Sequence, residues 1–290
     1  MSIAHSRSPR RAAMPEPLFP GAENLLNGHA AAFPMPTHKD LPETDGKPVE
    51  NMYESPQGYL LTSIFKRHLD RKHPDGQYVT AADSGIYWMA AKQPLEGCKS
   101  PDWYYIPGVP RLLEGEFRRS YVMWKEHVPP AIVIEFVSGT GAEEHDVTPG
   151  WGKFWIYERR IQAEYYAIWD PKRNKLEVYQ LEQGRYRCMK PDAKGRYNIT
   201  SLDARIGVWE GSYLGDESRW LRAWDSRGRL LPSFEETASL EKQRAENEKQ
   251  RAETEKQRAE NEKQRAENEK QRADKLAAKL RELGVDPTSI

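Results

Sequence analysis

The sequence predicts a mixed α/β domain that is followed by a long charged helix. Three patterns predict it: an apolar stripe at helical spacing, a series of short runs rich in β-branched and aromatic residues, and a seven-residue repeat near the end. The stripe predicts an amphipathic helix from Pro56 to Arg71. Because the short runs follow this helix along the chain, we expect one α/β domain over residues 51–215.

The short apolar runs predict strands, because their side chains suit a pleated and buried surface. A second, shorter helix is predicted over residues 151–160, and an excursion of the chain is expected around residues 112–124. The turn residues Glu182-Gln183-Gly184 predict a hairpin between the last two runs. The predicted strands are 77–81, 85–91, 102–106, 131–137, 163–169, 175–181 and 185–189.

Two segments flank this domain without a clear pattern of their own. Residues 1–50 contain eight of the 21 prolines and show no sustained periodicity, so we expect them to be disordered or loosely draped. Residues 216–235 contain Trp220, Leu221 and Trp224 and are expected to form a connector. The connector would join the domain to the repeat that follows.

Residues 236–290 are predicted to form a helical tail with a heptad repeat. The sequence Glu-Lys-Gln-Arg-Ala-Glu-Asn recurs every seven residues from Glu241, and Gly284 and Pro287 are expected to end the helix. A coiled coil needs two apolar positions in each heptad, whereas this repeat supplies one alanine. A single charged helix and a weak alanine-seam coiled coil therefore both stay open.

Composition excludes several classes of protein. Lys+Arg and Asp+Glu are both 44, so no global basic field indicates nucleic-acid binding, and such a surface would have to be a local patch. Cys98 and Cys188 are too few for a disulfide framework or a cysteine zinc site. No run approaches 18 apolar residues. We therefore expect a soluble cytoplasmic protein with no membrane partner.

Two predicted strands each carry one carboxylate within an apolar run. An unpaired carboxylate in such a place is costly, so Asp102 and Glu135 should have a partner, a proton or a metal ion. On neighbouring strands they would suit a hard cation such as Mg²⁺ or Mn²⁺. Lys153 begins the following helix, and Glu54 at the start of the first helix could be a third acid. The alternative is that each acid pairs with an arginine or lies at a strand end.

Several short motifs occur in a set order through the domain and again at the end of the chain. They are Pro101-Asp102, Ile134-Glu135-Phe136-Val137-Ser138, Asp146, Lys153, Tyr157, Tyr165-Tyr166, Asp170-Pro171 and Leu280-Arg281-Glu282-Leu283-Gly284-Val285-Asp286-Pro287. With these motifs, residues 50–290 resemble the putative restriction endonuclease domain family of the PD-(D/E)XK nuclease superfamily.

This resemblance implies a restriction-endonuclease-like αβββαβ core with a mixed sheet and a dependence on Mg²⁺. It implies that Asp102 and Glu135 are the metal ligands. The superfamily lysine usually lies two residues after the glutamate, where this chain has Val137, so the resemblance assigns that role to Lys153. Glu54 would assist these three catalytic residues.

The leading hypothesis is a Mg²⁺-dependent endonuclease that hydrolyses DNA phosphodiester bonds. Its local phosphate contacts would be Arg159, Arg160, Lys172 and Arg173. A homodimer through the nuclease domain or the C-terminal helix would suit cleavage of both strands. The alternative is an inactive nuclease-fold module that binds nucleic acid or protein and oligomerises through its tail. A transposon- or toxin-associated accessory protein is a third hypothesis.

Overall fold

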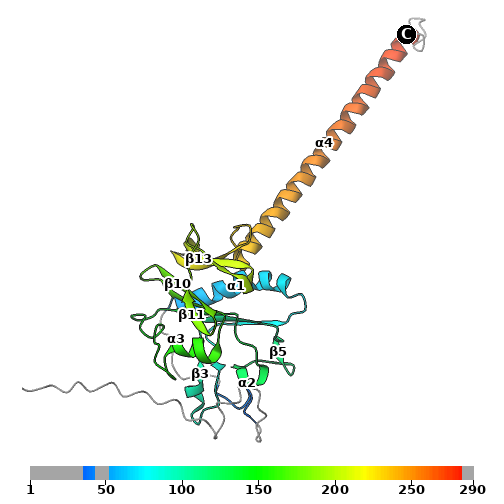
Figure 1. The fold of residues 1–290 in the computed structure, drawn as a ribbon. Coiled ribbons are helices and arrows are strands. Elements are labelled where there is room, and N and C mark those ends of the chain that lie inside the picture. The colour runs from blue at the N-terminus through cyan, green and yellow to red at the C-terminus, as the bar shows by residue number, and fades with distance from the viewer. Residues whose placement is uncertain (1–34, 43–51, 283–290) are drawn as a thin grey trace, which may run out of the picture. The chain divides into compact units, whose positions relative to one another are not determined.

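A six-stranded mixed sheet is the central element of the part of the chain that precedes Phe234 (Figure 1). The computed structural model describes residues 35–42 and 52–282. Strands β8 and β9 are parallel, and all the other neighbours in the sheet are antiparallel. The strand order is β1 (Tyr78–Ala81), β4 (Trp103–Pro107), β8 (Ile132–Phe136), β9 (Tyr165–Asp170), β10 (Lys175–Glu182) and β11 (Arg185–Cys188).

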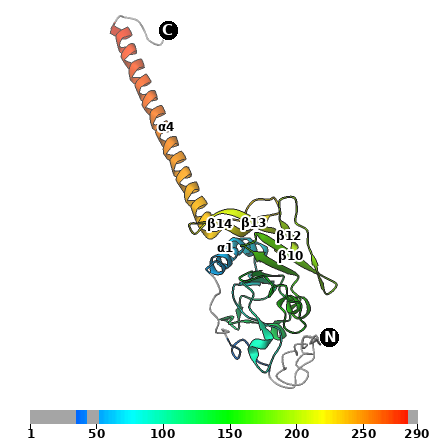
Figure 2. The same cartoon turned by 90° about the vertical axis from the view of Figure 1, so that its left-hand side faces the viewer.

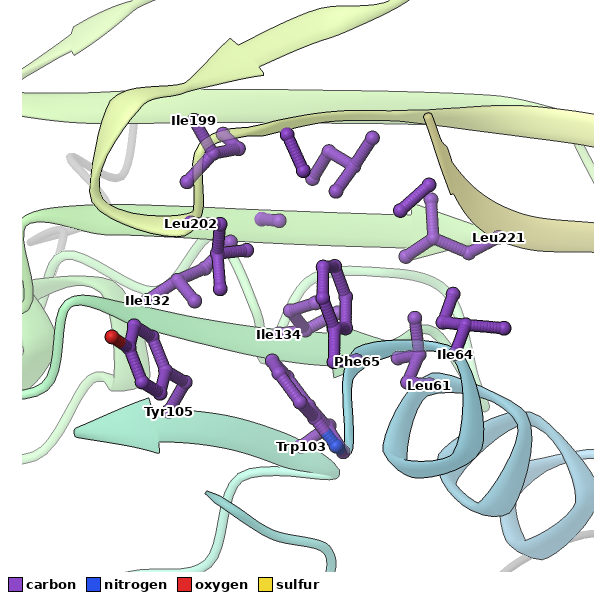
Figure 3. Packing of buried hydrophobic residues seen from close by; sticks show 14 of the residues in the cluster. Leu61, Ile64, Phe65, Trp103, Tyr105, Ile132, Ile134, Ile199, Leu202 and Leu221 are labelled. Atoms are coloured by element: carbon purple, nitrogen blue, oxygen red, sulfur yellow. The ribbon is translucent and has the colours of Figure 1, made fainter. Parts of the chain in front are cut away.

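Helix α1 (Glu54–Lys72) covers one face of this sheet and confirms the predicted first helix. Its apolar stripe is buried because it faces the strands, and Figure 3 shows Leu61, Ile64 and Phe65 directed toward Trp103 and Ile134. The helix ends where the His73 amide donates to the carbonyl of Leu69, just before the predicted Pro-Asp-Gly turn.

A second sheet of three strands packs into the same core (Figure 2). It contains β12 (Tyr197–Ile199), β13 (Ala204–Tyr213) and β14 (Asp216–Asp225), and the short η4 (Thr200–Leu202) joins the first two. Strand β14 pairs with β13 along its whole length. The expected connector over residues 216–235 is therefore wrong for its first half, and the domain does not end at residue 215.

A tight turn between β13 and β14 lies at the expected domain end, residue 215. Leu214 and Gly215 both have positive φ, which is the geometry of a two-residue hairpin turn. A glycine at this position thus reverses the chain and does not end the domain. Leu221 of β14 is fully buried and forms two hydrogen bonds with Gln57 of α1, which is also fully buried.

The opposite face of the central sheet is covered by smaller elements. Of the predicted strand 85–91 only the dipeptide Ile86–Tyr87 is a strand, and the amides of Trp88 and Met89 after it both donate to the carbonyl of Gly97. The predicted excursion 112–124 contains a short hairpin, a strand and a helical turn. The shorter elements of the domain outside its two larger sheets are β2 (Ile86–Tyr87), η2 (Pro94–Gly97), β3 (Cys98–Lys99), β5 (Leu112–Leu113), β6 (Glu116–Phe117), β7 (Tyr121–Val122), α2 (Met123–Glu126), α3 (Lys153–Ile156) and η3 (Tyr157–Ile161).

Residues 35–42 correct the expectation of a loosely draped N-terminal segment. Leu41 is buried against Tyr87 and Trp124. The Trp124 indole donates to the carbonyl of Pro36 at 3.0 Å, and the Tyr87 hydroxyl donates to that of Pro42 at 3.0 Å. Proline keeps its carbonyl acceptor although it lacks a donor, so aromatic donors hold this segment. The rest of the predicted segment lies outside the described residues.

Helix α4 (Phe234–Glu282) occupies the predicted tail and forms a compact unit of its own. It has 49 residues, none of them buried. Such a helix is supported by its many i,i+4 acid–base pairs, for example those that Lys242 and Arg244 can form. The expected end at Gly284 and Pro287 lies outside the described residues. Among the described helices, none is long and apolar enough to cross a membrane.

Truncation at two positions tests where the domain ends. A chain that stops after Ser233 should melt within about 3 °C of the full chain, because α4 contributes no buried residue. A chain that stops after Gly215 should show no cooperative melting, because Leu221 and its neighbours leave the core and Gln57 loses both hydrogen bonds to Leu221. Circular dichroism melts measure both. Equal melting of the two truncations would contradict this boundary.

Candidate active site

Asp102 and Glu135 meet on adjacent strands of the central sheet. The register between β4 and β8 pairs Trp103 with Ile134, so one further step places Asp102 opposite Glu135. Directly opposite residues of an antiparallel pair share a face, with Cβ atoms about 5 Å apart. Strand alternation puts both acids on the face that carries Tyr104 and the helical segment α3–η3. The carboxylate of Asp102 also accepts a hydrogen bond from the backbone amide of Phe136.

Glu135 is held by two side chains from the helical segment that links β8 to β9. Its side chain is only 1% exposed. Lys153 Nζ lies 3.1 Å from Glu135 Oε2, and the Tyr157 hydroxyl donates to Oε1 at 2.6 Å. Lys153 and Tyr157 are four residues apart, so they project from the same side of one helical turn. The predicted helix 151–160 is present as α3, which continues as the π-helical η3.

Lys153 is surrounded by acids. Besides Glu135, it lies 3.4 Å from a carboxylate oxygen of Glu143 and 3.9 Å from one of Glu144. Burial by itself lowers the pKa of an ammonium group, but the three acids outweigh it and raise the pKa of Lys153. The lysine is therefore a permanent cation at the edge of the carboxylate pair.

The surroundings favour the neutral form of Asp102, whereas they favour the charged form of Lys153. Burial, and then the charge of Glu135, raise the pKa of the Asp102 carboxyl to about 9 against an ordinary value of 3.8. The Phe136 amide and Lys153 oppose this shift, and Glu54 adds a small further rise. Asp102 therefore keeps its proton at neutral pH while Glu135 forms the ion pair. Glu54 thus lies within electrostatic reach of the site from the start of α1.

The two carboxylates fit a hard divalent cation. Mg²⁺ is typically held by one or two protein carboxylates, with waters and phosphate oxygens completing its shell. A cation next to Asp102 would take the place of its proton and remove the repulsion from Glu135. No group of three or more His, Cys, Asp or Glu suited to a metal occurs in residues 35–42 and 52–282.

The loop before α3 is positioned by a close backbone contact. A Cβ atom on Gly152 would lie 2.1 Å from the carbonyl oxygen of Asp146, which also accepts a hydrogen bond from the Trp155 amide. Only glycine therefore fits directly before Lys153. By contrast, a Cβ on Gly139 in the same loop would meet nothing within 4 Å. The loop between Asp146 and Lys153 is thus held in place, and the lysine that follows it lies beside Glu135.

The four expected phosphate contacts all have protein partners. Arg159 pairs with Glu158 at 2.8 Å, and the Arg160 guanidinium lies over the rings of Trp88 and Trp155. The other two bond to groups near the ends of β8 and β9: Lys172 to the Ser138 carbonyl at 3.1 Å and Arg173 to Asp170 at 2.5 Å. These residues are therefore not a free cationic cluster.

Sequence reasoning gave no role to four residues beside the expected ones. Tyr157 occurs in the motif series, and its role could have been inferred because it follows Lys153 by one helical turn and must share its face. Glu143 and Glu144 lie in an irregular loop, where no periodicity places a side chain. Lys99 follows a 3-10 turn, and its proximity to the site depends on how the small sheet folds over β4.

Replacement of the ionisable Asp102 carboxyl should change the pH dependence of stability. With a pKa near 9 in the fold and 3.8 in the unfolded chain, the metal-free protein binds the extra proton when folded, so its stability should fall as pH rises across that window. Asp102→Asn should flatten this fall and raise Tm at pH 7 in EDTA by a few degrees. Melts of both proteins from pH 5 to 9 measure it, with the exposed Asp216→Asn as control. Parallel curves would contradict the assignment.

A methyl group at Gly152 should disturb the lysine and the fold together. Gly152→Ala should lower Tm by about 3–10 °C, because overpacking of about 1–3 kcal/mol is expected when the Asp146 carbonyl has to move. Gly139→Ala is the matched control and should leave Tm unchanged within about 1 °C. Differential scanning calorimetry compares them. Equal Tm values would mean that the close contact does not constrain the loop.

Comparison with known proteins agrees with these observations. Residues 46–208 match the Uma2 family, described as "Putative restriction endonuclease". No curated protein matches. A crystal structure of "a putative nuclease belonging to DUF820" from Anabaena variabilis aligns with 16% identity and a TM-score of 0.39, covering 58% of this chain and 91% of that one. Because the family match spans more than half of the sequence, the chain belongs to the Uma2 family.

Proposed function

We propose that this protein is a Mg²⁺- or Mn²⁺-dependent endonuclease that hydrolyses DNA phosphodiester bonds. The observation that carries the proposal is the buried pair of Asp102 and Glu135 with Lys153 Nζ 3.1 Å from Glu135. Membership of a family described as restriction endonucleases supports the same reaction. Asp102 and Glu135 would be the metal ligands, and Lys153 and Glu54 the other catalytic residues.

The order of elements supports the proposed nuclease core. Along the chain, α1, β1, β4 and β8 are followed by α3 and then β9, with the shorter elements inserted between them. The expected αβββαβ core has this succession. The crossover through α3 brings Lys153 to the face on which the two acids lie. We propose that this crossover replaces the lysine that the superfamily usually carries two residues after its glutamate.

Each side chain has a definite task in the proposed reaction. A bound divalent cation would supply Lewis acidity, which neutralises charge on the phosphate and lowers the pKa of a water. Asp102 would release its proton to solvent when the cation is held. Tyr157 fixes the rotamer of Glu135 by its hydrogen bond. Lys153 stays charged and would orient the attacking water or the scissile phosphate.

An inactive binding module accounts for less of the structure. A module has no chemical need to bury an acid beside another acid, and the raised pKa of Asp102 shows that this arrangement costs stability in the folded chain. Proteins retain such local conflicts chiefly at functional sites. Dimerisation through the domain or through α4 stays a prediction that fits two-strand cleavage.

Cleavage assays with matched variants test this proposal. The purified chain should cut supercoiled, linear or single-stranded DNA with Mg²⁺ or Mn²⁺, and EDTA should abolish it. Asp102→Ala and Lys153→Ala should each lower kcat about 100-fold or more, because each removes a group that acts on the transition state. Tyr157→Phe should cost less, since Glu135 keeps Lys153 as a partner.

Lys194→Ala is the control, because this lysine is exposed in the loop that leads to β12. Cleavage that survives Asp102→Ala would contradict the metal assignment. No cleavage of any substrate, together with no metal binding, would favour the inactive module.

A further inference from the structure

A second lysine lies beside the carboxylate pair. Lys99 is the last residue of β3 and precedes Asp102 by three positions. Strand β3 pairs with β2, where Ile86 faces Lys99 across the ladder. Ile86 is fully buried in the core that also contains Tyr157. Lys99 thus lies on the small sheet whose residue Ile86 packs into this core, near enough to Glu135 and Lys153 for their charges to act on it.

The charges that act on Lys99 are those that act on Lys153. Burial and then the repulsion from Lys153 lower the pKa of Lys99, whereas Glu135 and Glu143 oppose that shift. The two ammonium groups thus share a neighbourhood with Glu135 and Glu143. Glu143 attracts both lysines, although its own side chain is 68% exposed.

The two lysines differ in their direct partners. Lys153 lies within 4 Å of three carboxylates. Within the described parts of the chain, the Lys99 ammonium has neither a hydrogen bond nor an ion pair of its own. A partly buried ammonium without an anion has lost hydration and gained little in return. An oxyanion from outside the protein would complete it.

We propose that Lys99 is a substrate-binding residue that contacts a backbone phosphate of DNA beside the Asp102–Glu135 pair. This inference rests on the proposed nuclease function and adds a residue to that site. Lysine binds phosphate as a point charge and needs no fixed geometry, which suits the end of a two-residue strand. The exposed Glu143 carboxylate marks the kind of group that both lysines attract. A DNA phosphate would enter the same field with its negative charge.

Salt-dependent DNA binding tests the proposal without relying on cleavage. Fluorescence anisotropy would follow a labelled duplex with the full chain in Ca²⁺, from about 50 to 200 mM salt. Lys99→Met should weaken binding of all sequences alike and reduce the slope of log K against log salt by about 1. Lys99→Arg keeps the charge and should retain the slope. Lys194→Met, at an exposed lysine in the loop that leads to β12, should also retain it. Melting curves would verify that each variant is folded.

The outcomes separate this inference from the proposed function. If the wild type cleaves DNA, Lys99→Met should lower kcat/KM by at least about 10-fold. A salt slope and a cleavage rate that both stay unchanged in Lys99→Met would then overturn the role of Lys99 alone. If the wild type binds DNA without cutting it and the slope still falls with Lys99→Met, the phosphate contact stands and the catalytic proposal fails. A wild-type chain that neither binds nor cuts DNA overturns both. Equal defects in folded Lys99→Arg and Lys99→Met would also overturn the charge-based role.

Discussion

The juxtaposition of two acids inside the central sheet is the constraint on which the rest of the site depends. Asp102 and Glu135 lie opposite each other because β4 and β8 pair in a register that leaves no other place for them. Burial and mutual repulsion make the pair unfavourable as two charges, so Asp102 holds a proton in the metal-free protein, and we propose that a cation replaces it. The Phe136 amide, Lys153 and Tyr157 all act on this pair.

The two faces of the central sheet have different roles: one packs in the main core, and the other carries the candidate site. One face packs against α1 and the sheet that contains β14 through a largely apolar core, and hydrogen bonds such as those of Gln57 with Leu221 and of Trp103 with Thr62 supplement it. The other face carries the acids, the crossover through α3 and the small sheet with Lys99. The first face stabilises the fold strongly enough to tolerate the electrostatic conflict on the second.

Local pattern was sufficient to predict α1, the strands around Asp102 and Glu135, and the β10–β11 hairpin, because periodicity and turn residues determine each of these. It also predicted that Lys153 begins a helix, and the structure places its ammonium on Glu135. Residues 216–225 were missed because Leu214-Gly215 reverses the chain, and only the fold supplies the partners of the aromatic residues that follow.

Other errors arose where tertiary contacts decide the conformation. Residues 35–42 have a composition typical of disorder. Nevertheless, the side chains of Trp124 and Tyr87 donate hydrogen bonds to backbone carbonyls of this segment. Arg160 could be read as a phosphate contact from its charge alone, whereas it packs on two indole rings. Lys99 is part of no recognisable motif. Its place near the carboxylate pair depends on how the small sheet packs, which the sequence pattern does not show. Charge type is visible in sequence, but the partner of a charge is a property of the fold.

We propose that one divalent cation replaces the proton of Asp102 at the carboxylate pair. Titration calorimetry with Mn²⁺ at pH 7, repeated in buffers of different ionisation enthalpy, measures binding and proton release together. The account predicts one ion for each chain, with close to one proton released, because the pKa of Asp102 is about 9 before the ion binds. It also predicts that Asp102→Asn abolishes this binding. Binding without proton release, or binding that survives Asp102→Asn, would contradict it.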